Sequence, residues 1–589
     1  MHLKIGIADE SFKHSYGRIS TAPKIERPSY DDIFSRSNIK LVTARNDRAA
    51  FQVVIRSDED ITVSVGSRPP FCEVPGILNL RISVESDSPD LKVTELCHIG
   101  YVEDDDRTMK ADILLQDEVV KVPADMLHCV WVEIKVPENM ESKTYAGYIK
   151  IYTQRMFEDE ELYKTLYFFI DVKNVKLPDP RDYSFHLDLW QHLSNIARKH
   201  EVRLWSDRHF EILEHYVKSL ADLGQKAVSI VASEIPWSGQ GCFRVTNYPS
   251  NLFEFNMVRI YKNGDFIYDF SVVERYINLC FKYGIDKEIE VHGLICIWQY
   301  ASEGFSKIAD DYPDAVRIRY FDHADGKYKY MRKKDEIIGY FKAIENYFIK
   351  TGLIDKVRIV ADEPHDKKLY NEVLKILKEH TPSFRYKAAI NHTDFIEESR
   401  DKLDDYVPYL PAVAKEWDQI KAMRGKIKGR LLWYVCCEPI YPNTFIASPL
   451  VESRLIGYIT ALINFDGFLR WNYTVWPGDP RKRISYNYPL WFAGDTNFVY
   501  PSSNGRPLLT LRYKALKRGI EEFELITMLR KKRDDSDEIL REVWNSIFRT
   551  TDITRFYDTG AKPETIYSLD HEDYEKARNI LLSALSDQS

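Results

Sequence analysis

Residues 1–175 alternate between apolar and polar positions in short runs that are separated by turn-forming residues. Segments such as LVTARNDRAAFQVVIRS (41–57), LNLRISV, CVWVEIKV, YAGYIKIYT and TLYFFIDV are rich in β-branched and aromatic residues. This alternation is typical of strands that bury one face. Helical periodicity is almost absent, so the pattern predicts an N-terminal all-β sandwich of about eight strands. The polar segment KLPDPRD (176–182), with its two prolines, indicates a linker.

From residue 183 onward, short apolar segments alternate with longer amphipathic ones. The apolar segments are suited to burial on both faces, as in parallel strands. The predicted strands are 183–190, 226–232, 288–295, 356–362, 384–390, 405–410, 430–435 and 466–471. Helical spacing of apolar positions marks most of the segments between them, and several end in glycine, which favours helix termination. Eight strand–helix units over about 300 residues predict a (β/α)8 TIM barrel.

The remainder of the chain changes character once more. Residues 471–507 are rich in Trp, Tyr, Pro and Gly, which indicates a loop region or a small β element. The strongly helical segment LLTLRYKALKRGIEEFELITMLRKKR follows, and the tail is largely helical. We therefore expect a multidomain protein with a β-sandwich at 1–175, a catalytic barrel at 182–507 and a short, mainly helical C-terminal extension at 508–589.

Composition and charge narrow the classes of partner. The 589 residues carry a formal net charge of −8, so electrostatics give no reason to expect nucleic acid or an anionic membrane. The N-terminus lacks a signal-peptide pattern, and no apolar run approaches the ~20 residues that cross a bilayer. The eight cysteines are scattered without a CxxC pair, which favours reduced thiols and a cytoplasmic location. Without an HExxH, EF-hand or P-loop motif, neither a metal nor another cofactor is expected.

The candidate active site lies where the fourth predicted barrel strand ends. TIM barrels carry their catalytic residues at the carboxyl-terminal ends of the strands. This strand ends in Asp362, Glu363 and Pro364, and two adjacent carboxylates are costly there without a function. Side chains alternate along a regular strand, so the backbone must leave extended geometry for both carboxylates to face the mouth. The alternative is a solvated strand end whose aspartate caps the next helix.

Two adjacent carboxylates favour one form of glycoside hydrolysis. They approach a sugar from the same side, which poorly suits an acid and a nucleophile on opposite faces of the ring. They suit substrate assistance, in which a 2-acetamido group of the sugar attacks C1. One carboxylate then orients that group, and the other acts as general acid and base. The first is expected to be ionised and the second protonated, because like charges separate their pKa values.

Several segments resemble glycoside hydrolase family 123. They are LDLWQHL, the ADEP strand end, DGFLRWNYTVWP and AGDTNFVYP, while ARNDRAAFQVVI and WVEIKVP are similar to the β-sandwich that precedes the barrel in this family. The resemblance implies an exo-acting β-N-acetylgalactosaminidase that releases terminal β-linked N-acetylgalactosamine from an oligosaccharide or glycoconjugate with retention. Asp362 would stabilise an oxazolinium-like intermediate, and Glu363 would protonate the leaving group and then activate water. The residues by themselves do not exclude N-acetylglucosamine, because the loops that contact the 4-hydroxyl decide between the two sugars.

Other strand ends supply candidate substrate-binding residues. Each candidate has side-chain atoms that can stack on a sugar or bind its hydroxyls, and each has an alternative role in turns, capping or core packing. The candidates are Trp190, Trp298, Asn391, His392, Tyr434, Glu438, Trp471, Asn472 and Asp495. Arg454, on the helix after the seventh strand, is expected to form an ion pair and not to contact sugar.

Two other functions compete with substrate assistance. In the first, Glu438 in CCEPIYPN is the nucleophile of a double displacement, and Glu363 is its acid and base. In the second, the chain is a non-catalytic carbohydrate-binding protein, whose sandwich or inactive barrel recognises sugars. The presence of both Asp362 and Glu363 argues against the second function, because binding alone gains little from two adjacent charges.

Overall fold

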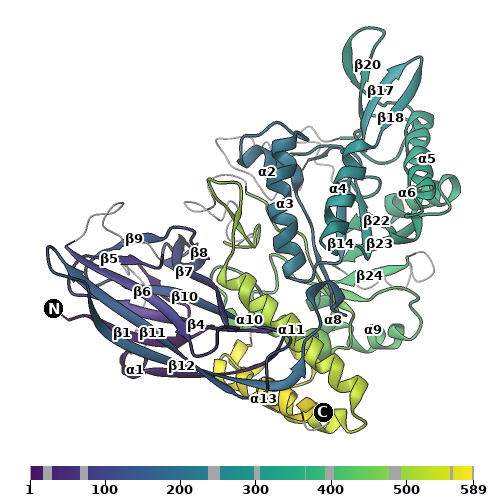
Figure 1. Ribbon diagram of the computed structural model, residues 1–589. Coiled ribbons are helices and arrows are strands. Elements are labelled where there is room, and N and C mark those ends of the chain that lie inside the picture. Colours follow the sequence, from purple (N-terminus) through teal and green to yellow (C-terminus); the bar gives the residue numbers. More distant parts are fainter. Residues whose placement is uncertain are drawn as a thin grey trace.

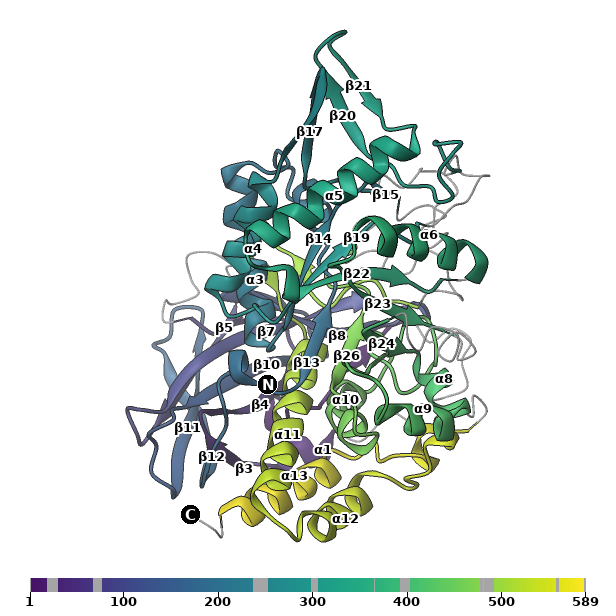
Figure 2. The same cartoon turned by 90° about the vertical axis from the view of Figure 1, so that its right-hand side faces the viewer.

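The structure is a computed structural model with two sheet-rich regions joined by C-terminal helices (Figures 1 and 2). It describes residues 2–17, 30–66, 77–236, 253–297, 306–364, 366–391, 403–476, 480, 492–557 and 561–586. Among these residues, no helix combines the length and the apolarity that crossing a membrane requires.

The described N-terminal strands form two six-stranded sheets over a common core. The first sheet has the order β1 (Lys4–Asp9), β4 (Asp47–Arg56), β10 (Leu127–Val136), β7 (Lys92–Glu103), β8 (Met109–Leu114) and β2 (Ser15–Tyr16). The second has the order β3 (Asn38–Arg45), β12 (Glu161–Lys176), β11 (Thr144–Arg155), β6 (Leu78–Ser86), β5 (Ile61–Ser64) and β9 (Val119–Val122). The short helix α1 (Asp31–Ser35) lies against β1. The rings of Phe51 and Phe168, one from each sheet, lie 5.5 Å apart in this core.

The predicted number of about eight N-terminal strands is too low. The sequence predicts one strand at 41–57, but the structure has two, β3 and β4, on either side of Asn46. Asn46 has a φ of 57°, in the left-handed region that turns the chain and that asparagine tolerates. The two strands therefore enter different sheets. Strands as short as β2 and β9 offer too few positions for an alternating pattern to be recognised.

Eight parallel strands of the described chain form the second region. They are β13 (His186–Leu189), β14 (Ala227–Val231), β19 (Glu288–His292), β22 (Val357–Asp362), β23 (Arg385–Ile390), β24 (Asp405–Pro408), β25 (Leu432–Tyr434) and β26 (Gly467–Arg470). Each overlaps one of the strands predicted from the sequence. We call them the strand ring, because their pairings return to the strand at which they begin. One set of paired strands has the order β14, β19, β22, β23 and β24, and the other has the order β13, β26 and β25. Parallel bridges from Leu187 to Gln225 and from Tyr409 to Tyr434 connect the two sets.

Helices follow seven of these strands in the described part of the chain. They are α2 (Leu193–Lys199), α3 (Asp207–Asp222), α4 (Ser271–Lys282), α5 (Lys334–Lys350), α6 (Lys367–His380), α8 (Leu410–Lys415), α9 (Trp417–Arg424), α10 (Leu450–Leu462) and α11 (Leu511–Lys532). Helix α3 shows why they form. The Ser206 hydroxyl accepts a hydrogen bond from the His209 N–H at its start, and Leu213, Val217 and Leu220 form a buried stripe at helical spacing.

A smaller sheet extends beyond the helices at the top of Figures 1 and 2. Its strand order is β18 (Asp265–Asp269), β17 (Arg259–Asn263), β20 (Arg319–Asp322) and β21 (Lys327–Tyr330). We call it the projecting sheet. The two-stranded pair β15 (Ile235–Pro236) and β16 (Phe253–Glu254) follows β14 in the chain, and β27 (Tyr500–Pro501) pairs with β28 (Pro507–Leu508) before α11.

Buried ion pairs connect the N-terminal sheets to the C-terminal helices α11 and α13 (His571–Ser586), and α12 (Ser536–Ile547) packs against α13. Arg518 of α11 donates to Glu10 at 2.8 Å and to Asp47 at 3.1 Å, and Arg512 donates to Asp112 at 2.9 Å. Removing one partner of such a buried pair costs about 3–5 kcal/mol, so these contacts hold the regions together strongly. The ion pair predicted for Arg454 is confirmed: its Nε donates to Glu522 of α11 at 2.9 Å.

Candidate active site

Asp362 and Glu363 lie at the carboxyl-terminal end of β22. Asp362 is the last residue of this strand and pairs with Ala389 of β23. Glu363 has a φ of 42°, although its N–H still donates to the Ala389 carbonyl at 3.1 Å. The backbone thus leaves extended geometry at Glu363, which allows neighbouring side chains to face the same side. A left-handed non-glycine residue costs of order 1–3 kcal/mol, and such strain is common at functional sites.

The carboxylate of Glu363 has neutral hydrogen-bond donors. The Tyr434 hydroxyl at the end of β25 donates to Oε1 at 2.5 Å, and the Asn391 amide after β23 donates to Oε2 at 3.2 Å. Burial raises the pKa of Glu363; the two hydrogen bonds oppose this rise, and the nearby negative charge of Asp495 adds to it. The site therefore favours a protonated Glu363 at higher pH than an exposed glutamate would show, which suits a general acid.

Asp362 is half-buried beside Glu363, and its backbone carbonyl accepts a hydrogen bond from the Cys296 thiol at 3.2 Å. The alternative role, an aspartate of the strand end that caps the next helix, belongs to another residue. Asp366 is the N-cap of α6, and its side chain accepts a hydrogen bond from the Leu369 N–H at 2.9 Å. Helix capping therefore does not account for Asp362.

Arg470, Trp471 and Asp495 are grouped at the end of β26. Arg470 donates to Asp495 Oδ1 at 2.7 Å, and the Trp471 indole N–H donates to the same oxygen at 3.4 Å. Burial raises the pKa of Asp495 to about 6, although the positive charge of Arg470 opposes the rise. Asp495 also lies in a turn, where its N–H donates to the Phe492 carbonyl at 3.0 Å. The turn that was the alternative role for Asp495 is thus present, together with an ion pair that the sequence did not reveal.

Aromatic side chains at the end of β13 lie beside those of two other strands. The Trp190 ring lies 4.9 Å from that of His292, which ends β19, and the His192 ring lies 6.4 Å from that of Trp471. Asn472, next to Trp471, is fully buried, and neither polar atom of its side chain has a partner among the described residues. A buried amide without partners costs about 1–3 kcal/mol, so Asn472 is suited to a ligand or water.

Glu438 is exposed just beyond β25. Its carboxylate accepts a hydrogen bond from the Tyr409 hydroxyl at 3.3 Å, and its carbonyl accepts one from the Cys436 N–H at 3.1 Å. The rings of Tyr409 and Tyr434 lie 5.4 Å apart, so Glu438 and Glu363 are joined through two neighbouring tyrosines. The remaining candidates, Trp298 and His392, lie outside the described residues.

Sequence reasoning missed several residues of this region. Tyr409, Arg470, His192 and His292 all follow or end a ring strand, as the predicted candidates do. A search of every strand end for polar and aromatic side chains would have found them. Their partners depend on which strands are neighbours, which a single segment does not show.

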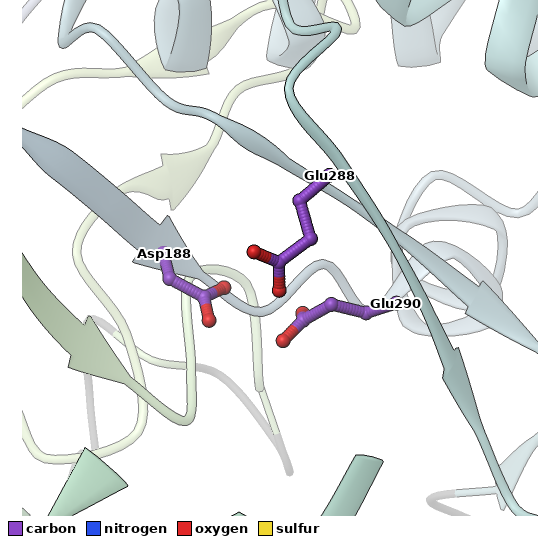
Figure 3. Close-up of side chains that lie close together, drawn as sticks. All are labelled: Asp188, Glu288 and Glu290. Atoms are coloured by element: carbon purple, nitrogen blue, oxygen red, sulfur yellow. The ribbon is translucent and has the colours of Figure 1, made fainter. Parts of the chain in front are cut away.

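A second acidic cluster lies deeper within the strand ring (Figure 3). Asp188 of β13 and Glu288 and Glu290 of β19 are buried, and their carboxylate oxygens lie within 4.8 Å of one another. The described residues contain no other group of three such side chains placed to hold a metal ion. The ammonium of Lys387 on β23, however, already contacts all three carboxylates, at 2.9 Å from both glutamates. A protein cation thus takes the place that a metal would need.

The pKa values of the carboxyl groups in this cluster are shifted in opposite directions. Burial raises the pKa of Asp188 to about 8, and the negative charge of Glu290 adds to the rise. Burial also acts on Glu288, but Lys387, His186 and Arg430 hold the pKa of Glu288 well below its usual range. The cluster therefore binds an extra proton near Asp188 while it keeps Glu288 ionised.

A cavity of about 940 Å³ lies elsewhere, between β3 and the helices α12 and α13. Side chains of both charges line it, among them Arg36, Lys40, Glu542 and Glu575. None of the candidate residues lines this cavity. The cavity is therefore separate from the candidate residues at the strand ends.

Comparison with known proteins identifies the family of the chain. Residues 190–529, more than half of the chain, match the family model for the catalytic domain of glycoside hydrolase 123. The chain is similar to a solved family 123 glycoside hydrolase from Clostridium perfringens, studied for glycolipid glycan hydrolysis, with a TM-score of 0.70 and 17% identity. That similarity covers 100% of this chain and 97% of the other, so the fold is shared along the whole length.

Two further solved structures are much less similar. A protein from Bacteroides vulgatus ATCC 8482, named as a candidate glycoside hydrolase, has a TM-score of 0.31 and 11% identity over 84% of this chain and 79% of its own. A β-D-glucuronidase of Dictyoglomus thermophilum has a TM-score of 0.28 and 9% identity over 81% and 66%. Among curated proteins, no match is found. The match over residues 190–529 is decisive, and the chain belongs to glycoside hydrolase family 123.

Proposed function

We propose that the protein is an exo-acting glycosidase that releases terminal β-linked N-acetylgalactosamine by a retaining, substrate-assisted mechanism. The strand ring is then a (β/α)8 barrel, and its active site lies at the carboxyl-terminal ends of the strands. One observation carries the proposal: adjacent Asp362 and Glu363 end the same strand, and a left-handed residue allows both to face one side. Hydrolysis of glycans by the similar Clostridium perfringens enzyme supports the substrate class.

In the first step, Glu363 is the general acid. Its proton passes to the glycosidic oxygen as the bond from C1 to that oxygen breaks. The carbonyl oxygen of the sugar's 2-acetamido group forms a bond to C1 from the opposite face, which gives a bicyclic oxazolinium ion. Burial raises the pKa of Glu363 and so keeps a proton available on it, while the hydrogen bonds from Tyr434 and Asn391 hold the carboxyl group in place and stabilise its ionised form after the proton has left.

Asp362 stabilises the positive charge that develops on the acetamido group. An ionised carboxylate aimed at the acetamido nitrogen favours the oxazolinium ion over the ground state. In the second step, Glu363 takes a proton from water, the water oxygen bonds to C1, and the bond between C1 and the acetamido oxygen breaks. Two inversions at C1 give net retention.

Side chains at neighbouring strand ends bind the terminal sugar in this proposal. Trp471 offers an apolar ring face, and its indole is held by Asp495, which is in turn held by Arg470. The unpartnered amide of Asn472 is available for a sugar hydroxyl. These contacts select a pyranose, and the side chains around its 4-hydroxyl decide between N-acetylgalactosamine and N-acetylglucosamine.

A panel of p-nitrophenyl β-glycosides tests the proposal. We expect hydrolysis of the N-acetylgalactosaminide and none above background of the galactoside, which lacks only the 2-acetamido group. Equal turnover of the two would overturn the mechanism. Hydrolysis of the N-acetylglucosaminide alone would retain the mechanism and correct the sugar.

The competing mechanism has one structural observation in its favour. Glu438 is exposed near Glu363 and is connected to it through Tyr409 and Tyr434. Glu438 would then attack C1 itself and form a covalent glycosyl-enzyme, with Glu363 as acid and base. A 2-fluoro glycoside would leave a mass adduct on the peptide that contains Glu438 under this mechanism, and none under substrate assistance.

A further inference from the structure

The projecting sheet has one covered face and one open face. Its inner face packs on α5: the Tyr268 ring lies 5.5 Å from that of Tyr340, and Lys262 lies 3.4 Å from Glu336. Side chains alternate along each strand, so the residues between these inner positions belong to the outer face. This outer face is what the sheet presents to its surroundings.

Four apolar side chains form a row across the outer face. Strand register places Ile267 opposite Tyr261, Tyr261 opposite Phe321, and Phe321 opposite Tyr328. The row therefore crosses all four strands, a distance of about 14 Å at the usual strand spacing. Tyr328 is 71% exposed and Ile267 is 54% exposed, although both residue types are costly to leave in water. A row of this kind indicates a binding surface.

Polar residues lie on both sides of this apolar row, and those on one side form an ion pair and a hydrogen bond with a residue of the strand ring region. On that side, Arg319 donates to Glu234 at 2.8 Å, and the Tyr330 hydroxyl donates to Glu234 at 2.7 Å. Glu234 follows the carboxyl-terminal end of β14. The outer face thus begins at the end of the strand ring that carries Asp362 and Glu363. On the other side of the row, His323 is exposed next to Phe321.

We propose that the outer face of the projecting sheet binds the glycan on the leaving-group side of the cleaved bond. The inference rests on the proposed function. In exo-cleavage the terminal sugar occupies the active site, and no further sugar is attached on its other side. The part of the substrate that extends beyond the strand ends is therefore the portion on the leaving-group side of the cleaved bond. Aromatic rings pack against the apolar faces of sugars, and flanking groups such as Arg319 and His323 bind hydroxyls. This combination, continuous with the cleavage site, fits an oligosaccharide.

The test compares two substrates that share the terminal sugar. One is the p-nitrophenyl glycoside, and the other is an oligosaccharide in which three further sugars extend from the anomeric carbon of the terminal residue. Tyr328→Ala and, separately, Tyr261→Ala should lower the ratio of kcat/KM for the oligosaccharide to that for the aryl glycoside by about threefold to tenfold. The control is Tyr148→Ala, an exposed tyrosine on a strand of the N-terminal sheets, which should leave the ratio unchanged.

The outcomes separate this inference from the proposed function. If the unmodified protein cleaves neither of the two substrates, the proposed function is contradicted. Cleavage of both substrates with an unchanged ratio in both variants would overturn the inference alone. A change from dimer to monomer by light scattering in Tyr328→Ala, with an unchanged ratio, would also overturn it and would assign the face to a second copy of the chain. In a titration without turnover, the oligosaccharide should bind more weakly to the protein that carries both Glu363→Gln and Tyr328→Ala than to the protein that carries Glu363→Gln alone.

Discussion

Two groups of carboxylates in the strand ring differ in what surrounds them. Asp188, Glu288 and Glu290 are fully buried and share the ammonium of Lys387. At the strand ends, Glu363 instead has neutral donors from Tyr434 and Asn391. Glu288, which fixed cations hold ionised, has little to gain from a change in protonation. A half-buried carboxyl group beside neutral donors, as Glu363 is, can give up a proton and take it back, which is what catalysis requires.

The two groups also differ in cost. Charges deep in the ring are compensated by neighbours on other strands, so the loss of one partner leaves an uncompensated charge. The strand-end pair is associated with a left-handed backbone at Glu363 and a buried, unpartnered amide at Asn472. Such features reduce stability and are expected where a ligand completes the site. Substitutions in the deep cluster should therefore change stability, and those at the strand ends should change activity.

The largest expected effect is that of Glu363→Gln on activity. The amide keeps the shape but has no proton to donate, and general acid catalysis contributes about 10²–10⁴-fold. Natural oligosaccharides with poor leaving groups should lose activity by this amount. Activated aryl glycosides, which need little protonation, should lose much less. Similar losses for both kinds of substrate in steady-state kinetics would assign Glu363 another role. The strand-end carboxylates would then not differ from the deep cluster in the way proposed here.

Lys387→Met should cause the largest loss of stability. It leaves three buried carboxylates without their shared cation, and breaking a buried pair costs about 3–5 kcal/mol in the free energy of unfolding. The control is Lys150→Met, which removes a surface pair with Glu85 and should cost much less, because solvent screens that pair. Urea unfolding measures both. Adding Glu290→Gln to Lys387→Met should recover part of the loss, because it removes one unpaired charge.

A smaller effect concerns the pH dependence of stability. The pKa of Asp188 is about 8 in the folded protein and near 3.8 when the chain is unfolded, so the folded state holds an extra proton between these values. Its contribution is complete below about pH 4 and is lost as the pH rises through about 8, with a slope of up to about 1.4 kcal/mol per pH unit. Asp188→Asn should remove this slope. An equal change of the free energy of unfolding with pH in the two proteins, from about pH 5 to about pH 8, would show that Asp188 is ionised throughout this range.

The smallest effect is expected from Tyr434→Phe. The Tyr434 hydroxyl stabilises the ionised form of Glu363, so its removal should raise the pKa of Glu363. Glu363 then stays protonated to higher pH, and the basic limb of the profile of kcat/KM against pH should move to higher pH. Tyr409→Phe, which removes the hydrogen bond to Glu438, serves as the control. An equal shift in both variants would mean that the hydrogen bond to Glu363 is not the cause.

The architecture of the ring was more predictable than the contacts within it. Buried parallel strands are continuous apolar runs, so all eight could be located, even β25 with its three residues. The sequence likewise revealed Asp362 and Glu363 as an unusual pair. It did not reveal that Tyr434 and Asn391 are their neighbours, because this depends on how strands distant in the sequence pair. In the N-terminal sheets, the turn at Asn46 carries no glycine or proline, and the strand count was therefore too low.

The deep cluster was not predicted for a related reason. Asp188, Glu288, Glu290 and Lys387 are charged residues on three otherwise largely apolar strands, and their pairing becomes evident only when the strands are arranged in a ring. Along the sequence, Asp188 and Lys387 are separated by nearly two hundred residues. Charge compensation is therefore a property of the tertiary structure, whereas adjacent Asp362 and Glu363 are a property of the sequence.

The most direct test of substrate assistance is the hydrolysis of aryl glycosides whose 2-acetamido group carries no, one, two or three fluorine atoms. Fluorine withdraws electrons from the carbonyl oxygen that is proposed to attack C1, while the leaving group stays the same. We predict that kcat/KM falls steeply with each added fluorine, because this oxygen is the nucleophile in the rate-determining transition state. Rates that are independent of fluorine content would contradict the role assigned to Asp362 and would favour attack by Glu438, with Glu363 as the acid in either mechanism.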